Sequence, residues 1–365
     1  MITIPAQTLE ALVSDIFAAA GCSKAEADRI GHSLVGANLT GHDSHGVVRV
    51  PRYLQWKREG DFIADQKLKV IKETPVMAVV DAQYGFGQSM APLAVEIGIR
   101  KAKAMGLAMV ALRNSGHVGR VGEWAEMAAA AGLVSIHYVN AAASLLVAPF
   151  GGVDKRFSTA PYACGIPRKG MDPIILDFAT SVVAEGKVLV ASQGGKKLPG
   201  DALIGPDGKT SGDPHLLYGA YEPQGPRNYQ TGPGAIRAFG EHKGSGMAFM
   251  CEVLGGSLTG TGAADEKRAK WANGMLSFYV DPSQLDATDF VPSDIARYVG
   301  YVKSSRPVEK GGEVLIPGEP ELRTRKQRLA NGVPLPADTW ASIVTAAKAT
   351  GVSEARIKQA GAVGA

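Results

Sequence analysis

The sequence predicts an α/β protein, with a central α/β region and a smaller helical domain formed by both ends of the chain. Helical patterns stand at the beginning and the end, and short apolar segments alternate with alanine-rich helical patterns between them. Such alternation is typical of an α/β domain. A segment rich in glycine and proline interrupts this region over residues 192–240, and we expect it to form a loop, either a lid or a subunit contact.

Three helices are expected at the N-terminus. Residues 8–21 (TLEALVSDIFAAAG) place leucine, valine and isoleucine at helical spacing and stop at a glycine. Ser23 and Glu26 have the spacing of a capping box, which favours a second helix from that point. Residues 50–60 (VPRYLQWKREG) predict a third helix, because proline is tolerated in the first turn.

Strands and helices are then expected to alternate. The segments that predict strands are LKVIKE (68–73), VMAVVDA (76–82), LAMVALRN (107–114), LVSIHYVN (133–140), PIILDFATS (173–181) and GMLSFYVDP (274–282). The segments that predict helices are 91–106, 122–132 and 243–260, followed at the C-terminus by 337–351 and 353–361. The expected domains are therefore a helical one of residues 1–66 and 320–365, and an α/β one of residues 67–319.

The composition is that of an ordinary soluble globular protein. The 365 residues are 20% charged and 45% hydrophobic, with a net charge of +4. Lysine and arginine are scattered, so no stripe for nucleic acid is evident, and no apolar run reaches the roughly 20 residues that span a membrane. The three cysteines lack CxxC spacing, which argues against a disulfide framework and a cysteine-based zinc site. The first residues do not resemble a signal peptide, and we expect a cytoplasmic protein.

The first candidate for a cofactor site is the turn Gly85-Phe86-Gly87, which follows a predicted strand and precedes a predicted helix. The third glycine of a dinucleotide fingerprint is missing, and the next strand ends in Arg113 and Asn114 instead of an acid. The pattern therefore favours a simple strand-to-helix turn. The sequence also lacks the GxxxxGK[ST] pattern of a P-loop.

A second candidate is residues 114–122 (NSGHVGRVG), again between a predicted strand and a predicted helix. Glycines let backbone amides approach a ligand, and a helix N-terminus favours an anion. His117 and Arg120 add a titratable group and a fixed positive charge. The structural alternative is a turn with a solvated arginine.

Other polar clusters lie at the ends of predicted elements. Residues 176–181 (LDFATS) place an aspartate and two hydroxyls after an apolar strand, where α/β proteins often contact ligands. His242 and Lys243 stand in the first turn of an apolar helix and oppose its dipole, which favours a bound anion. Residues 157–161 (FSTAP) and 316–319 (IPGE) are by themselves typical of turns.

Residues 41–49 (GHDSHGVVR) contain two of the seven histidines. His42 and His45 have a spacing that can bind a metal, but the third ligand of a zinc helix is absent and the glycine flanks suit a loop. Ser44 is adjacent to His45, which is poor geometry for a serine nucleophile. His45 and Arg49 fit a different chemistry, because an imidazole can give a proton to a carbonyl and an arginine can hold a carboxylate.

Six segments in order resemble one family, the malate/L-lactate dehydrogenase-type oxidoreductases that lack a Rossmann fold. The segments are GHDSHGVVRVPRYL (41–54), NSGHVGRVGEWAE (114–126), VAPFGGVDKRFSTAPYACGIPRK (147–169), LDFATS (176–181), EHKGSGMAFMCEVLGG (241–256) and LIPGE (315–319). The resemblance covers nearly the whole chain, and six ordered motifs are far more specific than one.

The resemblance implies an NAD- or NADP-dependent, reversible reduction of a 2-oxo acid. It also implies a non-Rossmann cofactor domain on a mainly antiparallel sheet flanked by helices, and a homodimer. By motif match His45 is the proton donor, Ser44 belongs to its relay and Arg49 holds the substrate carboxylate, while His117 is an alternative acid or base and Arg120 a further substrate contact. The positions that match cofactor contacts are His45, Gly119, Arg120, Val121, Thr159, Asp177, Phe178, Ala179, Thr180, Ser181, His242, Lys243, Asn273, Ile316, Pro317, Gly318 and Glu319.

Several alternatives stay open at this point. A metal-dependent hydrolase or lyase would use His42, His45 and His117, and a non-catalytic relative would bind a nucleotide without turnover. A cyclic-imine carboxylate reductase is less favoured, because that branch has an aspartate where this chain has Lys187. The identity of the 2-oxo acid and the choice between NAD and NADP are not fixed by these motifs, and residues 214–234 look long for the family.

Overall fold

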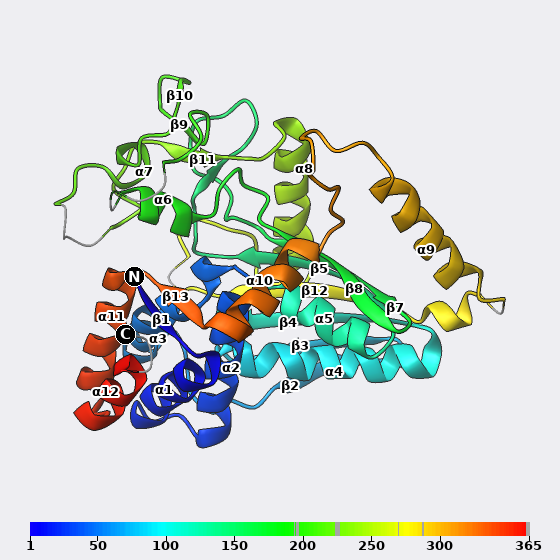
Figure 1. Ribbon diagram of the computed structural model, residues 1–365, viewed down its shortest axis with the longest axis horizontal. Helices are drawn as coiled ribbons and strands as arrows, with labels where there is room; N and C mark the ends of the chain where they lie inside the picture. The colour runs from blue at the N-terminus through cyan, green and yellow to red at the C-terminus, as the bar shows by residue number, and fades with distance from the viewer. Residues whose placement is uncertain (193, 195–196, 223–226, 269, 287, 363–365) are drawn as a thin grey trace.

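The computed structural model describes residues 1–362 with the exception of 193, 195–196, 223–226, 269 and 287. Its centre is a seven-stranded sheet. In the view of Figure 1 the helices of both chain ends lie at the lower left of the molecule, and a smaller sheet lies above them. This arrangement confirms the predicted α/β class.

The central sheet has the strand order β2-β3-β4-β12-β5-β7-β8. Its members are β2 (Lys69–Glu73), β3 (Met77–Asp81), β4 (Leu107–Ser115), β12 (Asn273–Val280), β5 (Val134–Ala141), β7 (Tyr162–Arg168) and β8 (Met171–Phe178). Only β3 and β4 pair in parallel, and the other neighbours are antiparallel. Each of the six segments expected as strands forms one, and the mainly antiparallel sheet is confirmed.

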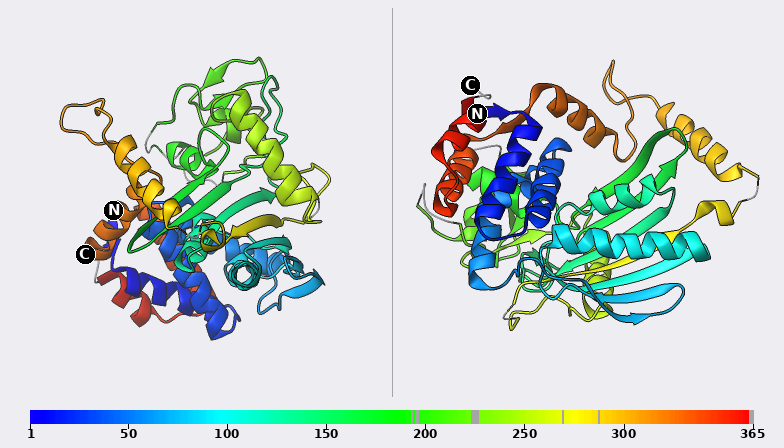
Figure 2. Two further views of the ribbon diagram at one scale, coloured as in Figure 1. Left: turned by 90° about the vertical axis from the view of Figure 1, so that its right-hand side faces the viewer. Right: turned by 90° about the horizontal axis from the view of Figure 1, so that it is seen from below.

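Two helices cover one face of this sheet, α4 (Gly87–Met105) and α5 (Gly122–Ala130) (Figure 2). Most side chains between them and the sheet are alanine, valine or leucine, and the fully buried Trp124 is the largest. On the other face, α8 (His242–Cys251) continues into a π-helical turn, Glu252–Ser257, which lies against β5 and β12.

The two chain ends share one hydrophobic core. It joins α1 (Ala6–Ala19), α2 (Lys24–Leu39) and α3 (Val50–Glu59) to α11 (Ala337–Thr350) and α12 (Glu354–Ala362). The short strands β1 (Ile2–Ile4) and β13 (Val333–Leu335) pair next to these helices. These helices were expected, and Ser23 caps α2 by accepting a hydrogen bond from the backbone N–H of Glu26 at 3.3 Å. The exact domain boundaries stay a prediction.

The glycine- and proline-rich segment contains more regular structure than a loop. Three short strands, β9 (Leu203–Ile204), β10 (Thr210–Ser211) and β11 (Ala235–Arg237), form a second sheet with β6 (Val147–Ala148). The helices α6 (Glu185–Ser192) and α7 (His215–Tyr218) complete this unit, which has its own apolar core. Strands of two or three residues are too short to produce a recognisable alternation, so the sequence pattern could not reveal them.

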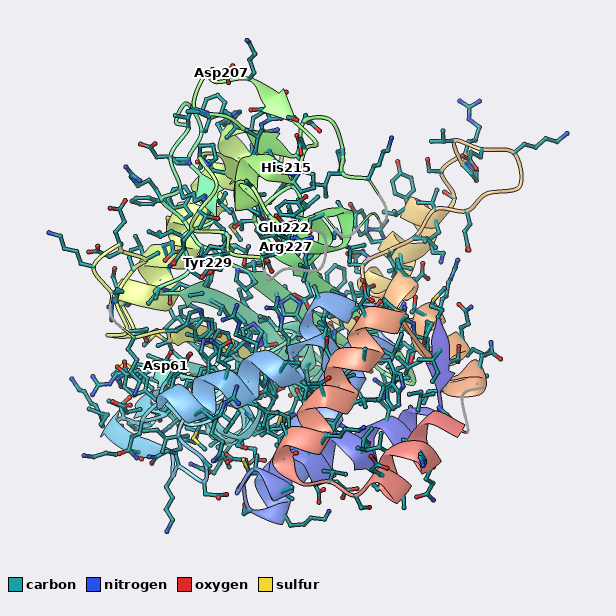
Figure 3. The ribbon with its side chains drawn as sticks, turned by 90° about the vertical axis from the view of Figure 1, so that its left-hand side faces the viewer. Asp61, Asp207, His215, Glu222, Arg227 and Tyr229 are labelled. Carbon is teal, nitrogen blue, oxygen red and sulfur yellow. The ribbon has the colours of Figure 1, made fainter. Side chains whose placement is uncertain are left out.

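This second unit extends from an outer tip to the neighbourhood of α3. Asp207 lies at the tip, and Glu222, Arg227 and Tyr229 lie on the side towards the terminal helices (Figure 3). Burial raises the pKa of the Tyr229 phenol, and the charges of Arg52 and Arg49 are close enough to act on it. The segment therefore reaches the start of α3.

Two helices were not expected, α9 (Phe290–Lys303) and α10 (Glu319–Asn331). Neither contains a buried residue. Val291, Ile295, Tyr298 and Val302 recur at helical spacing in α9, so this helix was missed although its pattern is present, whereas α10 is mostly charged and polar and has no apolar stripe. No helix in the described ranges is both long and apolar enough to cross a lipid bilayer.

Candidate active site

The segment GHDSHGVVR forms two consecutive 3-10 turns, Asp43–His45 and Val47–Arg49, that lead into α3. The amide of Asn38 holds both turns. It accepts a hydrogen bond from the backbone N–H of Val47 at 2.8 Å and donates to Asp43 Oδ1 at 2.6 Å. Gly46 lies so close to this amide that a Cβ there would overlap it. The segment is thus a fixed scaffold for its histidines.

Two histidines meet at this scaffold. The imidazoles of His45 and His117 are stacked, with ring centroids 5.5 Å apart and an interplanar angle of 12°. Both rings are half-buried. Nδ1 of His45 lies 3.1 Å from Ser44 Oγ. The structure therefore brings together the three residues that were expected to perform catalysis.

Arg49 lies next to the histidine pair. Its Nε donates to the backbone oxygen of Ser44 at 2.6 Å, whereas its two η nitrogens have no hydrogen-bond partner among the described residues. Its charge acts on the pKa of both histidines. A half-buried guanidinium edge beside two imidazoles is suited to a carboxylate ligand.

The loop that carries His117 is held by backbone contacts. The N–H of Gly116 donates to the oxygen of Gly85 at 2.8 Å, and a Cβ at Gly87 would overlap the carbonyl of His117. Gly87 thus makes room for the His117 loop, whereas a Cβ at Gly85 would lie 2.8 Å from the Cβ of Gln66, so close packing explains both glycines without a phosphate.

A chain of side chains extends from this loop into the sheet. Asn273 Oδ1 accepts from the backbone N–H of Val118 at 2.9 Å, and its Nδ2 donates to the oxygen of Asn140 at 2.5 Å. Asn140 donates in turn to Glu252 Oε2 at 3.1 Å, and Glu252 Oε1 accepts from Ser158 Oγ at 2.6 Å. Asn273 was expected to contact a cofactor, and both ends of its amide have partners inside the protein.

Tyr53 contacts His117 and Gln88 contacts Tyr53, and sequence reasoning did not single out either residue. The hydroxyl of Tyr53 lies 2.5 Å from His117 Nδ1, and Gln88 Nε2 donates to this hydroxyl at 2.9 Å. Trp271 packs beside the imidazole, with centroids 5.6 Å apart. Tyr53 is 64 positions from His117 in the chain, so no local motif links them.

Both imidazoles are neutral near pH 7. Burial lowers the pKa of His45 well below its ordinary value, and the charges of His117 and Arg49 lower it further. Burial lowers the pKa of His117 to about 3, with a smaller contribution from Arg49. A bound carboxylate would oppose both effects, because an anion favours the protonated imidazole.

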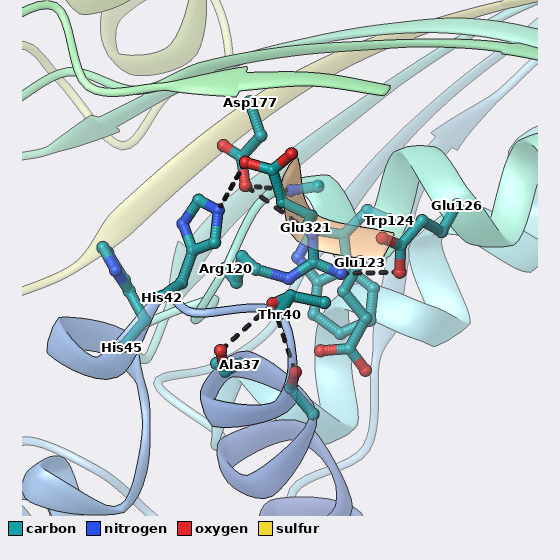
Figure 4. A network of polar contacts seen from close by, with 12 residues as sticks. Ala37, Thr40, His42, His45, Arg120, Glu123, Trp124, Glu126, Asp177 and Glu321 are labelled. Atoms are coloured by element: carbon teal, nitrogen blue, oxygen red, sulfur yellow. Dashed lines mark hydrogen bonds and ion pairs between the residues drawn. The ribbon is translucent and has the colours of Figure 1, made fainter. Parts of the chain in front are cut away.

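Arg120 occupies a different position from Arg49. Its side chain is buried, with Nη2 donating to Glu126 Oε2 at 2.6 Å and Nη1 lying 4.0 Å from Asp177 Oδ2 (Figure 4). Nη1 has no hydrogen-bond partner among the described residues. Arg120 thus has carboxylates of the protein beside it, unlike Arg49 in the described part of the chain, and the substrate contacts expected of both arginines stay predictions.

Asp177 and His42 surround the same arginine. Asp177 Oδ2 accepts from the backbone N–H of Gly122 at 2.9 Å, and burial raises the pKa of its carboxyl. His42 Nε2 lies 3.5 Å from Glu321 Oε1, which gives this histidine a partner on α10 (Figure 4). Among the residues that the structure describes, no three histidine, cysteine or acidic side chains are grouped as a metal site.

Most of the expected cofactor positions gather around the end of β8. The backbone N–H of Thr180 donates to the oxygen of Thr159 at 3.0 Å, and that of Ile175 to the oxygen of Pro317 at 3.3 Å. Phe178 packs edge-on against Phe239, just before the first turn of α8. The first turn of α8 contains His242 and Lys243. Residues 159, 177–181, 242–243 and 316–319 thus form one neighbourhood.

This neighbourhood is continuous with the histidine pair. After β8 the chain passes into α6, where Gly186 approaches Ser44 so closely that a Cβ would lie 2.7 Å from the Ser44 Cβ. Val121, another expected contact, is buried at the start of α5, and Gly119 adopts a φ of +71°, which favours glycine.

Several known proteins are similar to this chain over nearly its whole length. Residues 4–344 match the model of a family described as malate/L-lactate dehydrogenase. Hydroxycarboxylate dehydrogenase B of Escherichia coli K12 is 37% identical, over 96% of this chain and 94% of that protein. The Delta(1)-pyrroline-2-carboxylate/Delta(1)-piperideine-2-carboxylate reductase of Pseudomonas putida is 30% identical, over 91% of this chain and 93% of that protein. The solved malate dehydrogenase of Pyrococcus horikoshii OT3 has a TM-score of 0.84 at 27% identity, over 96% of each chain.

Proposed function

Because the chain belongs to the malate/L-lactate dehydrogenase family and is an oxidoreductase of the hydroxyacid dehydrogenase class, we propose that His45, His117 and Arg49 form the site at which it reversibly reduces a 2-oxo acid. The observation that carries this proposal is the stacked histidine pair beside an arginine whose η nitrogens have no partner in the described chain. A 2-oxo acid presents a carboxylate next to a carbonyl, which matches a guanidinium next to an imidazole.

In this proposal Arg49 fixes the substrate. Its two η nitrogens hold the carboxylate, and the bond from Nε to the Ser44 oxygen keeps the guanidinium in place. The position of the carboxylate directs the adjacent carbonyl oxygen to the imidazoles. The negative charge of the carboxylate also favours protonation of an imidazole whose pKa is otherwise low.

His45 moves the proton. In the direction of reduction, protonated His45 gives its Nε2 proton to the carbonyl oxygen, which becomes the hydroxyl of the product. In the reverse direction, neutral His45 takes that proton back. Ser44 Oγ suits both forms of the imidazole, because a hydroxyl can accept from Nδ1–H or donate to a bare Nδ1.

A nicotinamide dinucleotide, NAD or NADP, would supply or take the hydride when bound. The residues that would hold it are Thr159, 178–181, His242, Lys243 and 316–319. Two features fit a phosphate-bearing group: a lysine and a histidine in the first turn of α8, and the buried Arg120 Nη1 that lacks a partner among the described residues. Gly119 and Gly318, with φ of +71° and +94°, allow close backbone approach.

We also propose that the active form is a homodimer. Large apolar side chains are exposed on α8 and α9, among them Phe249 (56%), Tyr298 (58%) and Tyr301 (70%). Exposed aromatic side chains of this size often mark protein interfaces. Sedimentation velocity tests the proposal: a species of twice the chain mass supports it, and a monomer at every concentration contradicts it.

The catalytic proposal is tested by oxidation of NADH and of NADPH against a panel of 2-oxo acids. The panel should include oxaloacetate and pyruvate, the 2-oxo acids that correspond to malate and lactate, and Δ1-piperideine-2-carboxylate because an imine reductase is among the relatives. Oxidation of either cofactor with a 2-oxo acid is the expected result. Activity with the imine alone would show that the substrate is a cyclic imine and not a 2-oxo acid.

A further inference from the structure

We propose that Tyr53 and Gln88 are positioning residues that keep His117 neutral with its proton on Nε2, so that His117 holds the substrate carbonyl by a hydrogen bond while proton transfer falls to His45. The inference rests on the proposed function, because it divides two roles within that site. It depends on three side chains that form one hydrogen-bond chain from Gln88 through Tyr53 to His117.

Tyr53 is held rigidly in the core of the terminal domain. Its side chain is fully buried, and its ring packs against Phe17, Phe62 and Phe86 with centroid distances of 6.5, 5.7 and 6.3 Å. Only the hydroxyl leaves this apolar environment, 2.5 Å from His117 Nδ1. Burial raises the pKa of the phenol, so it stays protonated. The hydroxyl therefore has one proton to donate and a fixed place to donate it.

Gln88 determines the direction of that donation. Its Nε2 donates to the Tyr53 oxygen at 2.9 Å, so the tyrosine proton is free for another acceptor. In the part of the chain that the structure describes, the only acceptor within reach of this proton is His117 Nδ1. A nitrogen that accepts a hydrogen bond has no proton of its own, so the proton of the neutral imidazole is on Nε2.

The opposite direction would require the Gln88 amide to turn over. Gln88 is fully buried, and its Oε1 has no hydrogen-bond partner among the described residues. Turning the amide would place two N–H donors at this unpartnered position. Buried N–H groups without a partner are rarer than under-satisfied carbonyls, so the observed direction is favoured.

The two histidines therefore differ in what they can do. Nδ1 of His45 faces the Ser44 hydroxyl, which can rotate to accept or donate, so His45 can exist with one proton or with two. Nδ1 of His117 faces the Tyr53 hydroxyl, which donates to it. A second proton, on this Nδ1, would remove that hydrogen bond and would lie against the proton of Tyr53. Of the two neighbours of His117 on the adjacent turns, Arg49 and His45, the charge of Arg49 also opposes a charge on His117, and a protonated His45 would do the same because like charges repel.

Nε2 of His117 is available to a ligand. It has no hydrogen-bond partner among the described residues, and it is not one of the buried unpartnered side-chain atoms. A neutral Nε2–H can polarise a carbonyl without giving up its proton, because the neutral imidazole is a very weak acid. The proton that the product hydroxyl gains must then come from His45. With the hydride from the cofactor, this proton accounts for both hydrogens that the reduction adds.

The first test measures the tautomer directly, without substrate. Long-range ¹H–¹⁵N spectra of protein labelled at its histidines should show His117 protonated on Nε2, with Nδ1 accepting a hydrogen bond. The signals are assigned by their loss in His117→Gln. Tyr53→Phe should shift the Nδ1 resonance to the frequency of a nitrogen that accepts no hydrogen bond. Gln88→Glu replaces the donor to Tyr53 by an acceptor, so the Tyr53 hydroxyl should then donate to residue 88 and accept from His117, and the imidazole proton should move to Nδ1.

A proton on Nδ1 in the unmodified protein would overturn the inference, as would a spectrum that neither variant changes. Tyr279→Phe is the matched control, because this buried tyrosine packs on His137, far from the site in the sheet, and should leave His117 unchanged. If Gln88→Glu does not fold, Tyr53→Phe still decides the result.

The second test compares substitutions of the two histidines. Glutamine carries an N–H that can replace Nε2–H as a donor, but it cannot transfer a proton. His117→Gln should therefore keep kcat within about tenfold of the unmodified enzyme, whereas His45→Gln should lose about 100-fold or more. Equal losses would contradict the division of roles. Absence of all 2-oxo acid turnover in the unmodified enzyme would instead contradict the proposed function, whatever the tautomer of His117.

Discussion

The imidazole rings of His45 and His117 lie face to face, with centroids 5.5 Å apart and planes inclined by only 12°. The two residues are 72 positions apart in the chain. Two imidazolium ions at this distance would repel each other, so at most one of the pair is charged at a time. The pair can therefore carry at most one extra proton beside Arg49, which is the number that the proposed reduction of one carbonyl requires.

Arg49 should control substrate binding. Arg49→Lys removes the planar pair of η nitrogens and should raise the KM for 2-oxo acids by about tenfold to 100-fold, from the usual strength of charged hydrogen bonds, with a smaller change in cofactor affinity. Steady-state kinetics and NADH titration measure the two quantities. Arg58→Lys, at the exposed end of α3, is the matched control. An unchanged KM in Arg49→Lys would show that the carboxylate is bound elsewhere.

The stability of the fold should depend on pH through its buried histidines. An unfolded imidazole titrates near 6.5, whereas burial lowers the pKa of His117 to about 3 in the folded protein. Between these values the unfolded chain binds more protons, so the free energy of unfolding should fall as the pH drops from 6.5 towards 3. Burial lowers the pKa of His137 to about 3 as well, which adds to the same loss.

Urea unfolding at several pH values can isolate the share of His117. In His117→Gln the fall of the unfolding free energy should be shallower, by up to about 1.4 kcal/mol per pH unit between pH 6.5 and 3. Parallel curves for the two proteins would mean that His117 is not buried in its neutral form.

Arg120 should matter for stability more than an exposed arginine does. Arg120→Met would leave the carboxylates of Glu126 and Asp177 without their buried counter-charge, at a cost of about 3 kcal/mol or more. Arg113→Met, which breaks the more exposed pair with Asp81, should cost about 1 kcal/mol or less. Chemical denaturation of both variants tests the order, and a reversed order would refute it.

Metal removal should not affect the reaction. No three side chains of the metal-binding types are grouped in the described part of the chain, and His42 is paired with Glu321. Dialysis against a chelator is therefore expected to leave turnover unchanged. Loss of activity that zinc or iron restores would revive the hydrolase or lyase alternative.

Sequence patterns were sufficient for the main elements and for one half of the site. Strands such as β3 and β5 have largely alternating burial, and the terminal helices have apolar stripes, so local periodicity revealed them. The central-sheet strand β7 (Tyr162–Arg168) was not predicted. His45, Ser44 and Arg49 lie within one short segment, where their spacing could be read directly.

The rest of the site depends on contacts between distant segments. Tyr53 reaches His117 across 64 positions and Gln88 reaches Tyr53 across 35. In the sequence Tyr53 looked like an ordinary helix residue, and Gln88 lay in the turn before a predicted helix. The burial of Arg120 between Glu126 and Asp177 is equally invisible, because an arginine in a glycine-rich turn usually suggests a solvent-exposed or ligand-binding role. Such partners follow from packing, which local patterns do not encode.

The most direct test of the account is cofactor oxidation by the unmodified enzyme and by His45→Gln, measured side by side with NADH, NADPH and the 2-oxo acid panel. We predict turnover of at least one 2-oxo acid by the unmodified enzyme. We also predict a loss of about 100-fold or more in His45→Gln, with cofactor affinity retained. No turnover with either cofactor across the panel, or full activity in the variant, would contradict the account.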